Sequence, residues 1–532
     1  MLAISRRAWL LAILSAILQV IIFPLENLYV LGWIAVAPLL IALLHARPAA
    51  PLQLQGAEKL LAANPKQAFL LGYACGILWY GGTCYWVFNT MRQYGGIGAF
   101  GAAGLLILFC LYLALYHGAF GLIISLLSKR SLRVALIGAP FAWVAVELAR
   151  SRITGFPWDL LGTTQVDNIP LARISTYTGV YGMSFEILVV NTAFAAAFVV
   201  HRSRRRVLLV ASVFAACLLQ AARMVPAPAF PTDHTAVLVQ ANVPVLEGSD
   251  WTRQHFNDTL VDLGRITLTS TAGKNASLVV WPESPAPFYT GDPIFRTALT
   301  ELATTSHAWM VAGSVGIQNA EMSQQQPTHI FNSAALVAPD GNWDGRYDKM
   351  HLVPFGEYVP FKSLLGFAGG LTKEVGDFSR GSSRDPLQAG DQKLGIFICY
   401  ESVFPDEVRG FANRGAQVLV NISNDGWYGD SGAYAQHLKQ ARMRAVENAR
   451  WLLRDTNTGV TAAIDPFGRV VQTIPRKTRA ALVANYALEN ATTFYTRHGD
   501  WLAYACAIIT VGAIIFSFSS VSLTPGKGRP TE

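Results

Sequence analysis

Long stretches without a charged residue constrain this chain more than any other feature. Five windows of 18 to 36 residues contain no Asp, Glu, Lys or Arg: 8–25, 27–46, 67–91, 93–128 and 501–526. A helix that crosses a membrane needs about 20 mostly apolar residues, because the hydrocarbon core is about 30 Å thick and each residue adds about 1.5 Å. Each window is therefore predicted to form a membrane-spanning helix.

Three further stretches are weaker candidates. Residues 134–149 contain Glu147 near one end, residues 174–201 contain Glu186 in the middle, and residues 207–222 are uncharged but short. We therefore expect eight helices, seven before residue 225 and one after residue 500. A glutamate at membrane depth is costly and is a functional candidate by default. The plainer expectation is that Glu147 sits at the interface and Glu186 caps a broken helix.

The basic residues decide the predicted orientation. With the N-terminus in the cytoplasm, 14 Lys and Arg residues fall on the cytoplasmic side of the predicted spans and 5 fall outside. Because cytoplasmic loops carry an excess of Lys and Arg, both termini are predicted to be cytoplasmic. The polar block between helices seven and eight is then extracytoplasmic. So is the loop 151–172, which could touch the membrane-facing side of that block.

The start of the chain has a second interpretation. Arg6 and Arg7 precede the apolar stretch 8–22, which is also the pattern of a cleaved signal peptide. Six further candidate spans follow, and no clear cleavage site ends the stretch. A retained helix is therefore expected.

The composition argues for a membrane protein and against nucleic-acid binding. Only 14% of the residues are charged, against about 25% in an average soluble domain. The net charge is +8, but residues 1–231 hold 17 Lys and Arg against 6 Asp and Glu. The basic excess therefore lies in the apolar half, whereas a nucleic-acid-binding protein would carry it on a polar domain.

The predicted domain boundaries lie where the chain changes between long apolar stretches and a more polar composition. They are a seven-helix bundle at 1–224, a proline-rich linker at 225–233, a polar domain at 234–497, a last membrane helix at 498–522 and a cytoplasmic tail at 523–532. In the polar domain, short β-rich runs alternate with helical stretches, which predicts an α/β fold with buried sheets. The predicted strands are 235–243, 277–281, 309–316, 330–338, 394–400, 417–422, 460–464, 470–474 and 481–486, and the helices are 251–268, 293–306 and 432–450.

The cysteines indicate one candidate nucleophile. Five of the six lie in predicted membrane helices, and only Cys399 lies in the polar domain, so that domain has no internal disulfide. Cys399 follows the apolar run 394–398 and lies at the end of the predicted strand, at a turn, which is where α/β enzymes can place a nucleophile. The alternative is an inert buried cysteine, because free cysteine often behaves as a small hydrophobic residue.

A thiol nucleophile needs a base and a group that stabilises the oxyanion. Glu283 follows the strand that ends at Trp281 and could serve as the general base. Lys349 lies among polar and aromatic residues and could favour the thiolate and hold the oxyanion. His351 or His437 could be the base instead, as in a cysteine–histidine dyad. The domain has no Cys/His metal spacing and no Gly-rich phosphate loop, so no metal and no cofactor is predicted.

Several segments taken together resemble the nitrilase superfamily. The three that carry the resemblance are Trp281-Pro282-Glu283, the run Tyr-Asp-Lys-Met-His around Lys349, and Cys399-Tyr-Glu-Ser, which occur in order at near-family spacing. The segments 421–430 and 436–444 also match. With seven predicted helices before the domain and one after it, the whole chain resembles the apolipoprotein N-acyltransferase family, a membrane-embedded branch of that superfamily.

This resemblance implies a fold and an activity. The fold would be an αββα sandwich docked on an eight-helix transmembrane bundle, in a bacterial inner membrane with the sandwich in the periplasm. Cys399 would take an acyl chain from a phospholipid, usually phosphatidylethanolamine, as a thioester. The acceptor would be the free α-amine of the S-diacylglyceryl cysteine that begins an apolipoprotein. A monomer without cofactor is expected.

The resemblance also implies residue roles. Glu283 resembles the general base, Lys349 the oxyanion-stabilising group, and Glu357 the second glutamate that orients this set. Tyr400 and Glu401 match the residues that follow the nucleophile and shape the pocket. Trp251 resembles a tryptophan on a mobile arm over the site. The aromatic residues Phe361, Phe367, Trp427 and Tyr428 could form an acyl channel, contact the membrane interface or simply belong to the core.

Two other functions stay open from the sequence. A membrane-anchored amidase or nitrilase that uses water would carry the same Glu–Lys–Cys set, although eight helices would be excessive for a water-soluble amide. A transporter with an exported sensor domain would depend on Glu147 and Glu186 alone, which form no relay of buried charges.

Overall fold

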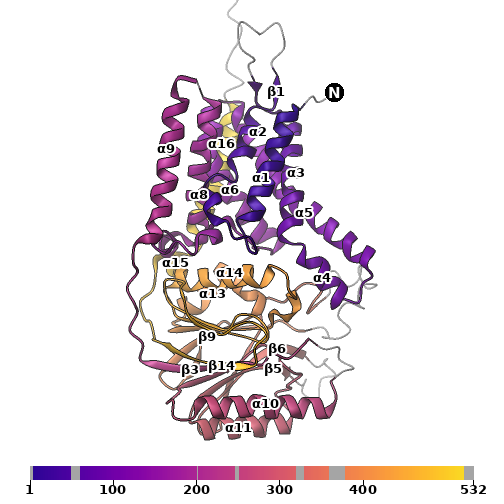
Figure 1. Cartoon of the computed structure of the whole chain (residues 1–532), viewed down its shortest axis with the longest axis vertical. Helices are drawn as coiled ribbons and strands as arrows, with labels where there is room; N and C mark the ends of the chain where they lie inside the picture. Colours follow the sequence, from indigo (N-terminus) through magenta and orange to yellow (C-terminus); the bar gives the residue numbers. More distant parts are fainter. Residues whose placement is uncertain are drawn as a thin grey trace, which may run out of the picture.

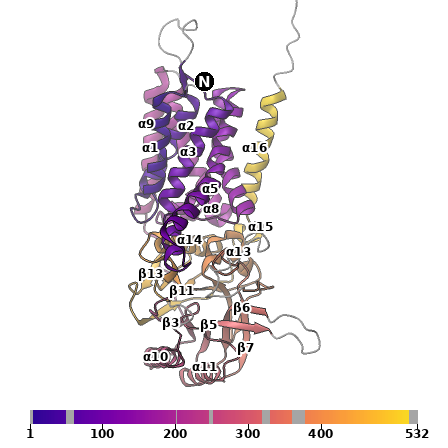
Figure 2. The ribbon, with the colours of Figure 1, turned by 90° about the vertical axis from the view of Figure 1, so that its right-hand side faces the viewer.

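The chain folds into a helical bundle and a sandwich of two β-sheets, stacked end to end (Figure 1). The computed structural model describes residues 4–48, 60–200, 202–245, 251–318, 329–358 and 378–519. The N-terminus and the end of the last described helix both lie at the end of the bundle farthest from the sandwich (Figure 2).

Each of the eight predicted windows contains helix. The helices are α1 (Arg6–Ile21), η1 (Tyr29–Trp33) with α2 (Ala37–Leu44), α3 (Pro65–Thr83), α5 (Ala99–Ser128), α6 (Leu132–Ala149), α8 (Ser175–Val199), α9 (Arg202–Ala221) and α16 (Trp501–Ser519). Within the described residues, five are long and apolar enough to cross a membrane, namely α5, α6 with its π-helical continuation to Thr154, α8, α9 and α16. The first two windows differ from expectation, because α1 has only 16 residues and the second is broken into η1 and α2. The count of eight spans therefore stays a prediction.

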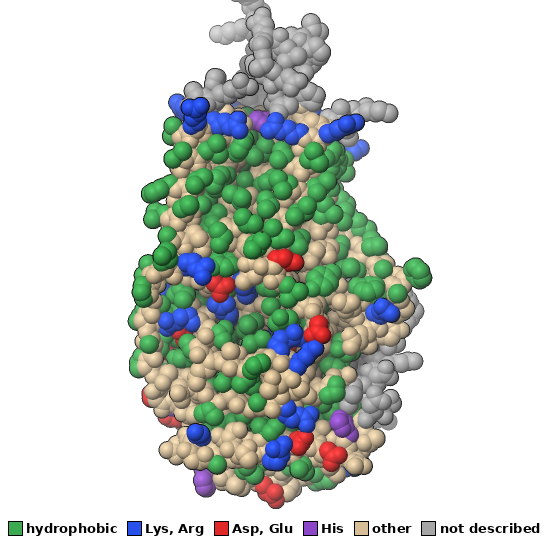
Figure 3. Space-filling view, viewed as in Figure 1, with side chains coloured by type: hydrophobic (Ala, Val, Ile, Leu, Met, Phe, Trp, Pro, Cys, Tyr) green, Lys and Arg blue, Asp and Glu red, His purple; other side chains and the backbone are tan. Residues whose placement is uncertain are grey.

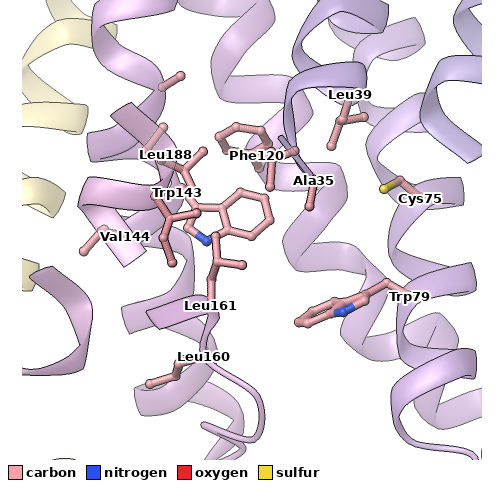
Figure 4. Packing of buried hydrophobic residues seen from close by; sticks show 14 of the residues in the cluster. Ala35, Leu39, Cys75, Trp79, Phe120, Trp143, Val144, Leu160, Leu161 and Leu188 are labelled. Atoms are coloured by element: carbon pink, nitrogen blue, oxygen red, sulfur yellow. The ribbon is translucent and has the colours of Figure 1, made fainter. Parts of the chain in front are cut away.

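Close packing holds the bundle together. A Cβ atom on Gly72 of α3 would lie 2.2 Å from the carbonyl oxygen of His117 on α5, and one on Gly121 would lie 2.3 Å from the carbonyl oxygen of Ala68. These two helices therefore cross at a distance that only glycine allows, as membrane helices often do. Figure 4 shows Trp143 of α6 in the middle of the core, with Phe120 and Leu188 beside it.

The two glutamates in the predicted spans have different surroundings. Glu147 is buried, and its Oε1 accepts a hydrogen bond from the backbone N–H of Leu161 at 2.8 Å. It therefore caps a short helical turn, η4 (Leu161–Gln165), and the expected position at the membrane interface stays a prediction. Glu186 is half-buried on α8, and its Oε2 has no hydrogen-bond partner among the described residues.

The sandwich consists of two six-stranded sheets. The first sheet has the order β14 (Ala480–Tyr486), β3 (His234–Gln240), β4 (Leu278–Trp281), β5 (Trp309–Gln318), β6 (His329–Val337), β7 (Trp343–Asp348). The second has the order β13 (Val470–Thr473), β12 (Ala462–Ile464), β11 (Leu452–Thr456), β10 (Val418–Ser423), β9 (Gln392–Ile398), β8 (Leu387–Ala389). Each sheet has a parallel centre, β3–β4–β5 in the first and β9–β10–β11 in the second, and antiparallel edges.

All nine predicted strands are present, and three described strands of the sandwich were missed. They are β7, β8 and β11. β7 reads Trp-Asp-Gly-Arg-Tyr-Asp and β11 reads Leu-Leu-Arg-Asp-Thr, so neither has the apolar run that identifies a buried strand. In β11 the charged side chains of Arg454 and Asp455 are buried because they have ionic or hydrogen-bond partners inside the domain.

Helices cover both outer faces of the sandwich, which gives the expected αββα layers (Figure 2). Helices α10 (Arg253–Thr271) and α11 (Pro293–Ser306) cover the first sheet, and α13 (Pro405–Asn413) and α14 (Ala433–Asn448) cover the second. The α13–α14 layer also faces the bundle. Tyr400, Val403, Phe404 and Tyr428 belong to the same hydrophobic cluster as the bundle helices, so the two parts share one continuous core.

The surface of the bundle changes along its length. In Figure 3, hydrophobic side chains cover its wall, and Lys and Arg side chains line the end farthest from the sandwich. Helix bounds identify basic residues at this end: α1 begins at Arg6, Lys129 and Arg130 follow α5, and α9 begins with a run that contains Arg204, Arg205 and Arg206.

Candidate active site

The ends of three strands bring the predicted Glu–Lys–Cys set together between the two sheets. Glu283 follows β4, Lys349 follows β7 in the same sheet, and Cys399 follows β9 in the second sheet. Their side chains are almost fully buried, with 5%, 1% and 6% of the residue exposed. Lys349 Nζ lies 3.3 Å from Glu283 Oε1, and both charges act on the Cys399 thiol.

Hydrogen bonds fix the Glu283 carboxylate at both oxygens. Its Oε1 accepts from Lys349 Nζ and, at 2.8 Å, from Asn332 Nδ2, while its Oε2 accepts from the backbone N–H of Asn424 at 2.8 Å. A carboxylate held in this way has one orientation, which is what a general base needs if it is to meet a proton at a defined place.

Glu357 lies on the other side of the lysine. Its Oε1 accepts from Lys349 Nζ at 2.9 Å and from Asn332 Nδ2 at 2.6 Å, and its Oε2 accepts from the backbone N–H of Val353 at 2.8 Å. Burial acts to lower the pKa of Lys349, but the nearby carboxylates of Glu283 and Glu357 outweigh it and raise that pKa. The lysine is therefore an ammonium, the form that can stabilise an oxyanion.

The backbone of Cys399 is unusual. The residue has a φ of +49°, in the left-handed region, and begins the 3₁₀ turn η8 (Cys399–Val403). Such a conformation is uncommon outside glycine and clusters at functional sites. Burial and the charge of Glu283 raise the pKa of the thiol, although Lys349 acts to lower it. The resting group is therefore a thiol, and Lys349 alone does not make the thiolate that the sequence suggested.

Glu401 joins the ends of β7 and β9. Its carboxylate accepts four hydrogen bonds: Oε1 from Tyr347 Oη at 2.7 Å and from the backbone N–H groups of Met350 and His351 at 2.8 and 3.1 Å, and Oε2 from that of Ile398 at 2.7 Å. Because Lys349 directly precedes two of these donors and Cys399 directly follows the last, Glu401 sets the spacing between lysine and thiol.

The two histidines considered as bases have other partners. His351 Nδ1 lies 2.9 Å from Glu407 Oε1, and its ring stacks on Phe404 at 3.7 Å. His437 Nε2 lies 3.1 Å from the carbonyl oxygen of Cys399, not from its sulfur. Among the described residues, Glu283 is therefore the better-placed base. No group of three or more described His, Cys, Asp or Glu residues could hold a metal ion.

Two turns of the sandwich face the bundle. One is η8 (Cys399–Val403), named the nucleophile turn after the candidate nucleophile Cys399, and the other is η9 (Asp425–Tyr428), which follows β10. Tyr400 Oη donates to the carbonyl oxygen of Gly155 at 3.2 Å, in the loop that was expected to touch the polar domain. That contact is confirmed, and Trp158 of the same loop donates through Nε1 to Gln436 Oε1 at 2.8 Å.

The other predicted substrate-binding residues lie in two places. Trp427 and Tyr428, in η9 (Asp425–Tyr428), pack against the short helix α4 (Trp86–Gln93) and the residue after it, with ring distances of 5.1 Å to Tyr94 and 5.2 Å to Trp86. Trp251 precedes α10, is half-buried against the outer helical layer and contacts the ring of His255 at 4.8 Å. Phe361 and Phe367 lie outside the described residues.

Comparison with known proteins covers almost the whole chain. A family model for carbon–nitrogen hydrolases matches residues 235–495, and a model for the apolipoprotein N-acyltransferase N-terminal domain matches residues 15–193. A protein of Geobacter metallireducens named apolipoprotein N-acyltransferase is 34% identical over 530 residues, which cover 98% of this chain and 97% of that one. The chain belongs to the apolipoprotein N-acyltransferase family.

Further relatives of the same name agree. That of Methylococcus capsulatus is 34% identical over 94% of this chain and 95% of its own, and that of Photobacterium profundum is 29% identical over 89% and 90%. Among solved structures, a carbon–nitrogen hydrolase of Helicobacter pylori matches 55% of this chain and 98% of its own at 16% identity, with a TM-score of 0.35.

Sequence reasoning missed one member of the site, Asn332. It lies on β6, and its side-chain amide donates to both Glu283 and Glu357, so it holds apart two carboxylates that would otherwise repel each other. A signal for it existed: Asn332 is a polar residue inside the apolar run 330–338, and a buried amide needs partners.

Proposed function

We propose that this chain transfers a fatty acyl chain from a phospholipid to the α-amine of the S-diacylglyceryl cysteine at the start of an apolipoprotein. The observation that carries the proposal is a buried Glu–Lys–Cys set whose nucleophile turn shares one hydrophobic core with an apolar bundle. The names of the relatives support the same activity.

In the first half-reaction we propose that Cys399 attacks the ester carbonyl carbon of the phospholipid. Glu283 takes the thiol proton as the C–S bond forms, and the Lys349 ammonium stabilises the resulting oxyanion. When the ester C–O bond breaks, the leaving lysophospholipid oxygen takes the proton from Glu283. The acyl chain remains on the enzyme as a thioester, so one difficult transfer becomes two easier steps.

In the second half-reaction the amine of the acceptor attacks the thioester carbonyl. Glu283 takes a proton from the amine as the C–N bond forms. The C–S bond then breaks, and the sulfur recovers its proton. Burial of the site favours transfer over hydrolysis, because it limits the access of water to the thioester. All three groups come from one chain, which is consistent with a monomer.

We also propose how the chain is placed in the membrane. We propose eight spans, with residues 1–224 and 498–522 in the membrane part and 234–497 as a periplasmic catalytic domain in a bacterial inner membrane, joined to the bundle by a linker at 225–233. The basic residues at the far end of the bundle support a cytoplasmic location for that end, because cytoplasmic loops are rich in Lys and Arg. Phosphatidylethanolamine is the proposed donor.

Cysteine labelling tests this orientation. Asp391→Cys introduces a thiol on the sandwich surface and Lys129→Cys one at the far end of the bundle, both in a Cys217→Ala background that removes the native cysteine that is exposed. We expect a membrane-impermeant maleimide to label position 391 in intact spheroplasts and position 129 only after lysis. The reverse pattern would place the sandwich in the cytoplasm and contradict the proposal.

A transfer assay tests the activity against the hydrolase alternative. The full chain in detergent receives phosphatidylethanolamine labelled in its acyl chains, with and without a synthetic S-diacylglyceryl-cysteine peptide. We expect labelled enzyme without the peptide and labelled N-acyl peptide with it, and none when the peptide amine is acetylated. Release of free fatty acid in both cases, with no label on the peptide, would identify a hydrolase.

A further inference from the structure

His437 of α14 contacts the nucleophile turn at its first residue, Cys399, and at Ser402. Its Nε2 lies 3.1 Å from the carbonyl oxygen of Cys399 and 2.7 Å from Ser402 Oγ. His437 and Ser402 are both fully buried, so water does not compete for these contacts. A single side chain outside the turn therefore contacts it at two points.

The other ring nitrogen of His437 is held equally firmly. Nδ1 lies 3.0 Å from Asp425 Oδ1 and 3.0 Å from Arg454 Nη2, and Arg454 Nη2 bonds to Asp425 Oδ2 at 2.8 Å. A carbonyl oxygen can only accept, so we assign the proton to Nε2. Nδ1 then accepts from Arg454 Nη2, which also donates to Asp425 Oδ1 at 3.1 Å and so offsets the carboxylate beside Nδ1. Burial, followed by the charge of Arg454, lowers the pKa of His437, which favours this neutral ring.

Ser402, His437 and Asp425 have the spacing of a serine-hydrolase triad, which suggests a second nucleophile. That interpretation fails on access. Ser402 is 0% exposed, and it belongs to the turn after Cys399, so no ester could reach its oxygen while the turn is folded. The arrangement instead holds a loop in place.

We propose that His437 is a positioning residue for the nucleophile, a claim that rests on the proposed acyl transfer through Cys399. By donating to the Cys399 carbonyl, it fixes the peptide that follows the cysteine. Fixing that peptide helps to keep Cys399 in its left-handed conformation, with φ of +49°, in which the thiol lies within the influence of Glu283 and Lys349. A left-handed conformation is unfavourable for a residue with a Cβ atom, so without this hydrogen bond the turn relaxes and the thiol moves.

The same histidine connects the nucleophile to the bundle. The ring of Trp158 stacks on His437 at 5.8 Å with an interplanar angle of 17°, and its Nε1 donates to the neighbouring Gln436. Gln436 also donates to the carbonyl oxygens of Pro24 and Thr83 in the bundle. The position of α14, and with it His437, is therefore set by contacts from both parts of the molecule.

Two substitutions separate positioning from simple stability. Gln places an amide nitrogen near the position of Nε2 and so keeps a donor for the Cys399 carbonyl, whereas Asn places one near Nδ1 and does not. Intact-protein mass spectrometry follows thioester formation on Cys399 in the full chain with phosphatidylethanolamine micelles. We expect His437→Asn to slow it about 100-fold, the size of effect that a misplaced reacting group produces, and His437→Gln to retain activity within about tenfold, both with unchanged KM for the donor.

The exposed His498 supplies a control, His498→Asn, which should react like the unmodified chain. Equal rates for His437→Asn and the unmodified chain would overturn the proposal. So would equal losses for the Asn and Gln variants that parallel their melting temperatures. If the unmodified chain forms no thioester, the proposed function fails separately. Alkylation of Cys399 by iodoacetamide in the same variants then decides the positioning role, since it depends only on the thiol.

Discussion

Replacing Cys399 with alanine is expected to abolish both half-reactions while the fold survives. Alanine leaves no atom that can form the thioester, so the acyl chain has no covalent intermediate and the acceptor has nothing to attack. We expect transfer to fall by about four orders of magnitude or more, as when the nucleophile of a catalytic set is removed. Intact mass spectrometry should find no acyl adduct, and the peptide assay should find no labelled product.

Cys217→Ala is the matched control for this substitution. It makes the same chemical change on the exposed Cys217 of α9, far from the site, and should leave transfer unchanged. The melting temperature of the Cys399→Ala protein in detergent checks that the fold is intact. Transfer at the normal rate in this variant would remove the cysteine from the mechanism.

The second large effect is expected for Glu283→Gln. Glutamine keeps the volume, and its one oxygen can accept from either Asn332 or the backbone N–H of Asn424, but it cannot take a proton from the thiol. Because the resting Cys399 has a raised pKa, loss of the base leaves it protonated. We expect thioester formation to slow by about 100- to 10,000-fold, the usual contribution of a general base, while donor binding is retained.

Thioester formation and donor binding are measured separately for this variant. The adduct on Cys399 is followed by mass spectrometry, and binding by retention of labelled phospholipid on the immobilised protein. Glu301→Gln, on the exposed surface of α11, controls for the change of charge. An acylated cysteine that appears at the normal rate in Glu283→Gln would show that another group is the base.

The active site was predictable where a reactive residue follows an apolar strand. Glu283 and Cys399 come directly after the buried runs 277–281 and 394–398, so both the strand and its end could be identified. Lys349 follows β7, a strand too polar to identify. It contacts Glu357 through its ammonium and Asn332 through its backbone N–H, across 8 and 17 residues of chain. The sequence can identify such residues as candidates, but it does not show that they lie close together in the fold.

His437 shows the same limit from the other side. It was a candidate base because histidine is the usual partner of a reactive thiol. In the folded chain, α14 places the ring beside the carbonyl oxygen of Cys399. A base would have to lie beside the sulfur of the same residue. Only the packing of the helix decides which atom of the cysteine the ring meets.

Charge-free windows in the sequence located the helices, but they did not show where a helix is interrupted. The window 27–46 is interrupted between η1 and α2, and α2 starts at Ala37 with Pro38 in its first turn, where proline is tolerated. The window 67–91 is divided at Cys84, where α3 ends and the polar helix α4 soon begins at the junction with the sandwich. Hydropathy averages over such changes of direction.

The core shared by the bundle and the α13–α14 layer makes the membrane part a component of the enzyme and not a tether. A soluble fragment cut at residue 234 would leave Tyr400, Phe404 and Tyr428 uncovered and would remove the indole that stacks on His437. Such a fragment would be a poor target for inhibitor screening, because the contacts that orient its thiol would be lost. Compounds against this chain should therefore be sought with the full-length protein in lipid or detergent.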